Sequence, residues 1–208
     1  MPIIKNKILE YIESELSEDP ILFGHSLGGF IALSMAVTND NLFKKIIIID
    51  SYPFMSAVYN PAATEENVAP QAKIMKQMLV QAPDSLYVNQ QAMIMSTMIT
   101  DSAKIQLALL WSLQSDRETI GQAMFELMTT DLRDKLSSVS TPLLVLGSWI
   151  GGKDYGVTKE VTLTNFKNQY ARAENADIKI AETAKHFIMW DDFDWFLEEI
   201  NAFLNNGK

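Results

Sequence analysis

The chain has 208 residues, a formal net charge of −9, two histidines and no cysteine. Hydrophobic residues make up 48% of it, enough for one buried core but not for two. The negative charge argues against a nucleic-acid partner, because such surfaces gather Lys and Arg. Without cysteine there are no disulfides, catalytic thiols or thiolate metal sites, and two histidines argue against a zinc site. We therefore expect a small-molecule substrate, no metal and no cofactor.

The longest apolar runs, residues 46–49 and 143–146, have the length of strands. A membrane-spanning helix needs roughly 20 apolar residues, so the sequence predicts no membrane span. Residues 1–4 lack the basic and apolar regions that begin a secretory signal. These features predict a cytoplasmic protein, and a signal upstream of Met1 would change that expectation.

The first fifty residues show helix and strand patterns in turn. Isoleucines and a leucine recur at helical spacing near the N-terminus and predict an amphipathic helix: Ile4, Ile8, Ile12 and Leu16. A short apolar run at 21–23 predicts a strand buried on both faces. Residues 27–37, rich in Ala, Leu and Met, predict a helix, and residues 45–50 predict the next buried strand.

The last seventy residues repeat this alternation. Residues 141–147 predict a strand, 158–170 a helix, 177–180 a weak last strand, and 195–204 a closing amphipathic helix. Strands that alternate with helices favour right-handed crossovers and a parallel sheet. The fold class is therefore α/β, with a partial parallel sheet of about four strands flanked by helices.

No convincing strand pattern occurs between Pro53 and Leu136, where three or four helices are expected instead. Eight of the eleven methionines lie in this stretch. Flexible thioethers suit ordinary irregular packing or an adaptable apolar pocket. We predict a core at 1–52, an all-helical cap or lid inserted at 53–136, and a second core segment at 137–208.

Gly24-His25-Ser26-Leu27-Gly28 fits the pattern G-x-S-x-G between a predicted strand and a predicted helix. A serine on such a sharp turn needs neighbours without a Cβ, so Gly24 and Gly28 are expected where the two backbones pass closely. The turn would place the Ser26 hydroxyl at a helix N-terminus. There the Leu27 N–H can stabilise a developing oxyanion.

This motif in its strand-turn-helix setting resembles the nucleophile elbow of α/β-hydrolases of the esterase and lipase type. The resemblance extends from the Ser26 strand to the last helix, and the family's earlier strands have no counterpart here. It implies a catalytic triad in the chain order serine, acid, histidine, with Ser26 as the nucleophile.

Only one histidine follows Ser26 at a distance. His186 comes after the last predicted strand and before the closing helix, where the family carries its general base. A neutral imidazole there can take the Ser26 proton and return it to the leaving group. A lone histidine is otherwise more often structural. His25, inside the elbow, is expected to be a packing or hydrogen-bonding neighbour.

Two residues compete for the role of the acid. The family often carries it shortly after the strand that ends here at Gly147, which favours Asp154, displaced by four residues from the usual G-x-x-D spacing. The Gly151-Gly152 pair would allow the loop to bulge and deliver that carboxylate to His186. Asp50 is the alternative, because it ends the preceding strand, where some members place the acid. We prefer Asp154 as the acid. If Asp154 is not the acid, we expect it to be a solvated turn residue.

The second oxyanion donor of this fold comes from a loop upstream of the elbow, for which this chain has no counterpart. The Ser26 strand would then lie at a sheet edge with unpaired backbone groups. We expect a homodimer or a missing N-terminal half at this edge. A truncated sequence, a second subunit or a loss of catalysis would each explain the pattern.

Two functions remain open on these grounds. The resemblance implies a serine hydrolase that cleaves a small, fairly apolar ester through an acyl-enzyme on Ser26. The alternative is a non-catalytic or incomplete module that binds an apolar ligand or a partner through the Met-rich helices.

Overall fold

A computed structural model describes residues 1–205 and contains one parallel sheet with the strand order β1-β2-β3-β4. The four strands are β1 (Ile21–His25), β2 (Lys45–Ile49), β3 (Leu143–Gly147) and β4 (Ala176–Ile180). The prediction of a partial parallel sheet of about four strands flanked by helices is confirmed. Because the strands are parallel, all four carboxyl ends meet at one edge of the sheet.

The apolar strands β2 and β3 are buried on both faces, as continuous hydrophobic runs require in a parallel sheet. The prediction that the run at 21–23 is buried on both faces is wrong, because β1 lies at the edge of the sheet. Alternate residues of β2 point to opposite sides, so Ile46 and Ile48 join one core cluster while Ile47 and Ile49 join the other. The strands β2 and β3 thus form the centre of the molecule.

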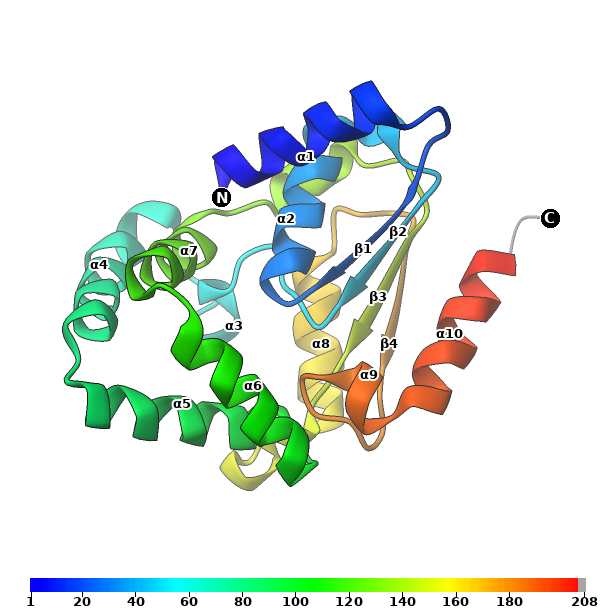
Figure 1. Cartoon of the computed structure of the whole chain (residues 1–208). Coiled ribbons are helices and arrows are strands. Elements are labelled where there is room, and N and C mark those ends of the chain that lie inside the picture. The colour runs from blue at the N-terminus through cyan, green and yellow to red at the C-terminus, as the bar shows by residue number, and fades with distance from the viewer. Residues whose placement is uncertain (206–208) are drawn as a thin grey trace.

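Helices cover both faces of the sheet (Figure 1). The larger cluster packs under α1 (Pro2–Glu15), α2 (Leu27–Ala36) and α8 (Lys159–Gln169). The smaller cluster packs under α9 (Ile188–Asp191) and α10 (Phe193–Asn205). Short 3₁₀ turns occur at η1 (Asp40–Leu42), η2 (Asp134–Ser138) and η3 (Ile150–Tyr155).

Five helices lie between β2 and β3 in the chain, and residues 53–136 form no strand. They are α3 (Ser56–Tyr59), α4 (Glu65–Gln81), α5 (Asp84–Met98), α6 (Ser102–Gln114) and α7 (Arg117–Thr129). We call them the inserted helices. Within them α4 packs against α7, and α5 packs against α6. The division at 52 and 136 stays a prediction, and residues 206–208 of its third segment lie outside the described residues.

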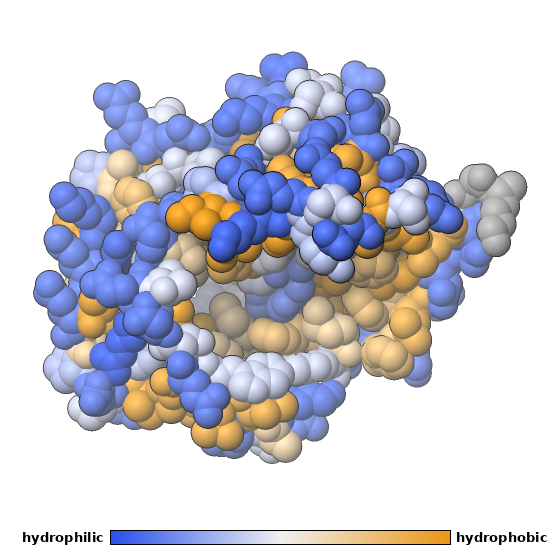
Figure 2. Space-filling model, turned by 45° about the horizontal axis from the view of Figure 1, so that its top comes forward, coloured by the Kyte–Doolittle hydropathy of each residue, from blue (hydrophilic) through white to orange (hydrophobic). Residues whose placement is uncertain are grey.

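Within residues 1–205, β1 pairs only with β2 and is therefore an edge strand. Its apolar side chains Ile21 and Phe23 are 41% and 47% exposed. Figure 2 shows hydrophobic residues gathered on the side of the molecule where Figure 1 places the strands. The expected partner at this edge stays a prediction. Over the described residues, no helix combines the length and the apolar character needed to cross a bilayer.

Candidate active site

The carboxyl edge of the sheet carries four polar residues, one after each strand. Ser26 follows β1, Asp50 follows β2, Ser148 follows β3 and His186 lies in the loop after β4. Parallel pairing brings these strand ends together, since His25 is in register with Ile49. Residues that are far apart in sequence therefore meet at one place.

Ser26 lies on the sharp turn between β1 and α2 that the G-x-S-x-G pattern predicts. Its φ of 53° and ψ of −120° lie in a region that non-glycine residues rarely adopt. Such a conformation costs of order 1 to 3 kcal/mol and persists only where the surroundings enforce it. Two backbone hydrogen bonds do so here: Ser26 N–H donates to Ile49 O at 2.9 Å, and Phe30 N–H donates to Ser26 O at 3.1 Å.

The close approach between strand and helix occurs at one of the two glycines for which the sequence predicts it. A Cβ on Gly24 would lie 2.5 Å from the Gly28 carbonyl oxygen, so the predicted close approach is present at that residue. A Cβ on Gly28 would meet nothing within 4 Å, and the steric reason given for Gly28 is therefore wrong. Gly29 takes that role, because its Cβ would lie 2.6 Å from Ser51 Cβ.

The role of the Leu27 N–H as an oxyanion donor stays a prediction. Leu27 is the first residue of α2 and lines the same cavity as Ser26. The N–H groups of the first helical turn have no acceptor within the helix and carry the positive end of its dipole. This N–H is therefore free to bind an oxygen that develops negative charge beside Ser26.

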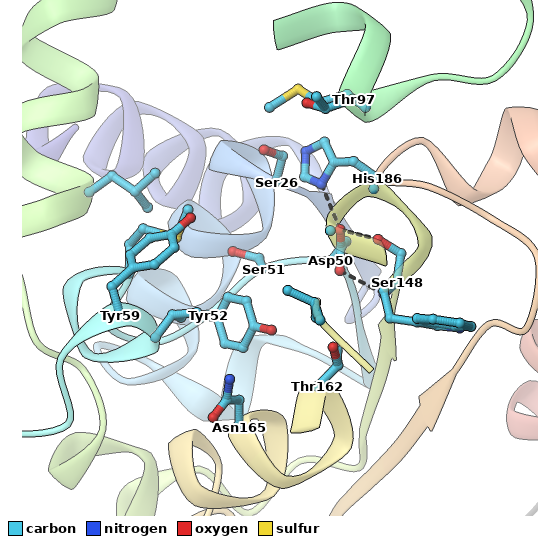
Figure 3. A pocket seen from close by; sticks show the side chains of 18 of the residues that line it. Ser26, Asp50, Ser51, Tyr52, Tyr59, Thr97, Ser148, Thr162, Asn165 and His186 are labelled. Atoms are coloured by element: carbon cyan, nitrogen blue, oxygen red, sulfur yellow. Dashed lines mark hydrogen bonds and ion pairs between the residues drawn. The ribbon is translucent and has the colours of Figure 1, made fainter. Parts of the chain in front are cut away.

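His186 is held by Asp50. The His186 Nδ1 and the Asp50 Oδ2 are 2.7 Å apart, and both side chains are largely buried, at 18% and 11% exposed. Figure 3 shows the other edge of the imidazole turned toward Ser26. An N–H on Nδ1 that donates to Asp50 leaves Nε2 as the unprotonated nitrogen. The ring can then accept a proton from the side of Ser26.

Ser148 fixes the carboxylate of Asp50 from the other side. Its backbone N–H donates to Asp50 Oδ1 at 2.8 Å, and its hydroxyl donates to Asp50 Oδ2 at 2.7 Å (Figure 3). With the bond from His186, the carboxylate accepts three hydrogen bonds. Ser148 belongs to no recognisable motif, and its position directly after β3 is the one signal in the sequence for this role.

The expectation that Asp154 reaches His186 is wrong in this structure, and the alternative, Asp50, occupies that place. Asp154 lies in η3 with an exposed side chain and does not line the cavity beside His186. Gly151 and Gly152 line that cavity, but Asp154 does not. A Cβ on Gly151 would lie 2.4 Å from the Thr97 carbonyl oxygen, so Gly151 lets η3 pack against the end of α5.

His25 is a hydrogen-bonding neighbour, as predicted. Its Nε2 lies 3.0 Å from the backbone oxygen of His186, which can only accept, so His25 carries its proton on Nε2. The two imidazole rings lie 4.6 Å apart between centroids. Burial first, and then the nearby His186, lower the pKa of His25 from 6.5 to about 4. His25 therefore stays neutral at ordinary pH and braces the backbone of His186.

This pKa predicts a loss of stability in mild acid. Between pH 6.5 and about 4 the unfolded chain protonates His25 and the folded chain does not, so the free energy of unfolding falls as the pH falls through this window. His25 alone should lower the free energy of unfolding by about 2 to 3 kcal/mol across this window. Urea unfolding at pH 7 and pH 4 should show a larger decrease in the free energy of unfolding for the natural protein than for His25→Gln. Equal losses would contradict the assigned protonation.

A cavity of about 490 Å³ opens over Ser26 and His186. Its walls come from the sheet edge, from η3 and α8, and from the inserted helices. Most lining side chains are apolar or aromatic, among them Met55, Val58, Tyr59, Met98, Met124, Leu127, Trp149, Val157 and Val161. The described residues lining it include no Lys or Arg. No cluster of three metal-ligating side chains occurs anywhere in residues 1–205.

Comparison with known proteins agrees with this architecture. A family model described as "Alpha/beta hydrolase family" matches residues 7–199. The chain is similar to the solved structure of MenH from S. aureus, with a TM-score of 0.67, 19% identity and coverage of 98% of this chain and 73% of that one. An esterase from Exiguobacterium antarcticum gives a TM-score of 0.73, 18% identity and coverage of 96% and 72%.

A hydrolase from Pseudomonas aeruginosa gives a TM-score of 0.74, 14% identity and coverage of 97% of this chain and 70% of that one. These identities are low, so the similarities to solved structures concern the fold. No curated protein matches the chain significantly. The family model, however, spans nearly the whole sequence, including β1 to β4 and the turn that carries Ser26. The chain therefore belongs to the alpha/beta hydrolase family.

Proposed function

We propose that this protein is a serine hydrolase that cleaves a small, uncharged and fairly apolar ester through an acyl-enzyme on Ser26. The observation that carries the proposal is the alignment of Ser26, His186 and Asp50 along the carboxyl edge of the sheet. Membership of the hydrolase family supports hydrolysis in general. The strained turn and the buried histidine support Ser26 as the reacting group.

In the proposed first step, the Ser26 oxygen attacks the ester carbonyl carbon while His186 Nε2 takes the hydroxyl proton. The carbonyl oxygen becomes an oxyanion, and the Leu27 N–H stabilises it by hydrogen bonding. His186 then gives the proton to the leaving alcohol as the carbon–oxygen bond breaks. Asp50 keeps the imidazole in the correct tautomer and stabilises its cationic form.

A second half-reaction completes the cycle. Water attacks the acyl carbon, and His186 takes one water proton and returns it to Ser26 as the acyl bond breaks. The carboxylic acid leaves, and the starting protonation states of both residues are restored. No metal or cofactor takes part in either step as proposed.

The lining of the cavity supports an uncharged substrate. Asp50 is a nearby negative charge, and the lining residues that the structure describes include no Lys or Arg to neutralise a substrate carboxylate. The methionines, valines and Leu127 favour a hydrocarbon portion on the acyl or alcohol side. The esterase from E. antarcticum is a relative in fold whose name states ester cleavage.

The proposal is tested by steady-state hydrolysis of p-nitrophenyl butyrate and of mono-p-nitrophenyl succinate. We expect kcat/KM to be higher for the uncharged ester, and Ser26→Ala or His186→Ala to lower kcat by about 10⁴-fold or more. Activity that survives in both variants would show that another group performs the reaction. A preference for the anionic ester would contradict the proposed substrate class.

A second candidate function is ligand or partner binding through the inserted helices. It is favoured by their exposed methionines, since Met75, Met78 and Met93 are 46%, 68% and 69% exposed. This function requires saturable binding of an apolar ligand that Ser26→Ala leaves unchanged. It also requires that the natural protein hydrolyse neither test ester.

A further inference from the structure

One wall of the cavity carries neutral polar side chains that have no hydrogen-bond partner in residues 1–205. They are Tyr52, Thr162 and Asn165, and all three line the cavity. Thr162 is 4% exposed, and its hydroxyl oxygen is not one of the fully buried polar atoms, so it is accessible from the cavity that the residue lines. Polar groups that remain unpaired in a cavity are where a ligand can form hydrogen bonds at no cost to existing ones.

Two elements bring these residues together. Thr162 and Asn165 are three residues apart on α8, so they lie on the same side of that helix. Tyr52, in the segment after β2, stacks on the next α8 residue, Phe166, with ring centroids 4.2 Å apart and an interplanar angle of 25°. Figure 3 shows the three side chains on the side of the cavity away from Ser26.

All three side chains are uncharged. Burial and the nearby Asp50 raise the pKa of Tyr52, so its phenol stays protonated and can donate a hydrogen bond. The Thr162 hydroxyl and the Asn165 amide can each donate or accept. A ketone, hydroxyl or amide would satisfy these groups, whereas a methyl group would leave them unpaired.

We propose that Tyr52, Thr162 and Asn165 form a polar subsite that binds an uncharged hydrogen-bonding group of the substrate, such as a ketone, hydroxyl or amide. This inference rests on the proposed function and narrows the substrate to an ester that carries such a group away from the scissile carbonyl. The apolar lining then binds the hydrocarbon that connects the two ends.

The test uses p-nitrophenyl esters that differ only at the distal group. The pairs are 4-oxopentanoate with 4-methylpentanoate and 5-oxohexanoate with 5-methylhexanoate, so that two spacings are covered. We expect the natural protein to prefer one of the keto esters by about 10-fold or more in kcat/KM. The double variant Thr162→Val/Asn165→Leu should reduce that ratio by about 10-fold. Thr164→Val is the matched control, because Thr164 lies on the exposed side of α8.

A binding measurement keeps this inference separate from catalysis. In Ser26→Ala protein, which cannot form the acyl-enzyme, calorimetry compares the methyl esters of both keto acids with the methyl esters of their methyl-branched analogues. At least one keto ester should bind more tightly than its analogue. The preference should disappear with Thr162→Val/Asn165→Leu and persist with Thr164→Val. If neither keto ester is preferred, or if the double variant keeps the preference, the subsite is overturned. If the natural protein hydrolyses none of the esters but the Ser26→Ala protein still binds a keto ester more tightly, the proposed function is overturned and the subsite is not.

Discussion

Asp50→Asn is expected to lower kcat for ester hydrolysis by about 10⁴-fold while the fold is preserved. Asp50 Oδ2 accepts the Nδ1 hydrogen of His186 at 2.7 Å, which leaves Nε2 free to act as the base. An amide that presents its NH₂ group to Nδ1 favours the opposite tautomer, with the hydrogen on Nε2. The proton of Ser26 then has no acceptor in the site.

Asp154→Asn is the matched control for this prediction. It makes the same chemical change in an exposed residue of η3 that does not line the cavity. We expect kcat and KM of this variant to equal those of the natural protein. Stopped-flow or steady-state assays of both variants, with circular dichroism to verify folding, decide the matter. A large loss in Asp154→Asn with little change in Asp50→Asn would show that the acid has been assigned wrongly.

Gly24→Ala is expected to destabilise the protein by about 3 kcal/mol or more. The new Cβ would lie 2.5 Å from the Gly28 oxygen and 2.7 Å from the Gly29 Cα, and both atoms belong to the backbone of α2. Rotation of a side chain cannot relieve such a clash. The helix would have to move away from β1, and the turn that holds Ser26 would lose its geometry.

Gly28→Ala is the control within the same motif. An added Cβ meets nothing within 4 Å, and the residue lies inside α2, where Ala is favoured over Gly by up to about 1 kcal/mol. We expect unchanged or slightly higher stability in urea unfolding. If Gly24→Ala is as stable as the natural protein, the backbones at Gly24 must be farther apart than this structure shows.

Local sequence patterns were sufficient for the sheet and for two of the three residues of the proposed triad. The apolar run 46–49 cannot face solvent on either side, so it had to become a central buried strand. Ser26 could be located from the G-x-S-x-G motif between a predicted strand and a predicted helix, and His186 from the resemblance, as the one downstream histidine after the last predicted strand. The parallel order of the strands then placed the strand ends at one edge.

The identity of the acid depended on tertiary structure. Asp50 and Asp154 both follow predicted strands, and the sequence does not reveal the path of the loop between β3 and α8. That path is fixed by the close packing of Gly151 against the Thr97 carbonyl, a contact between two segments more than fifty residues apart. Gly151 therefore allows close packing against a backbone carbonyl, and Gly152 allows close packing against the Val157 side chain, instead of a bulge that brings Asp154 to His186.

The polar wall of the cavity was missed for a similar reason. Thr162 and Asn165 look like ordinary residues of an amphipathic helix, where polar side chains usually face water. Their placement inside the cavity follows from the rotation of α8 against the sheet, with Phe166 fully buried beside Tyr52. The spacing of three residues was visible in the sequence, but the side of the helix that faces the cavity was not.

Ser26 is proposed to be an activated nucleophile, and labelling with a fluorophosphonate tests this activation most directly. Intact-mass spectrometry of the folded natural protein should show a single adduct, and the same treatment of Ser26→Ala should show none. An unlabelled natural protein that is well folded, or an adduct that persists in Ser26→Ala, would contradict the claim.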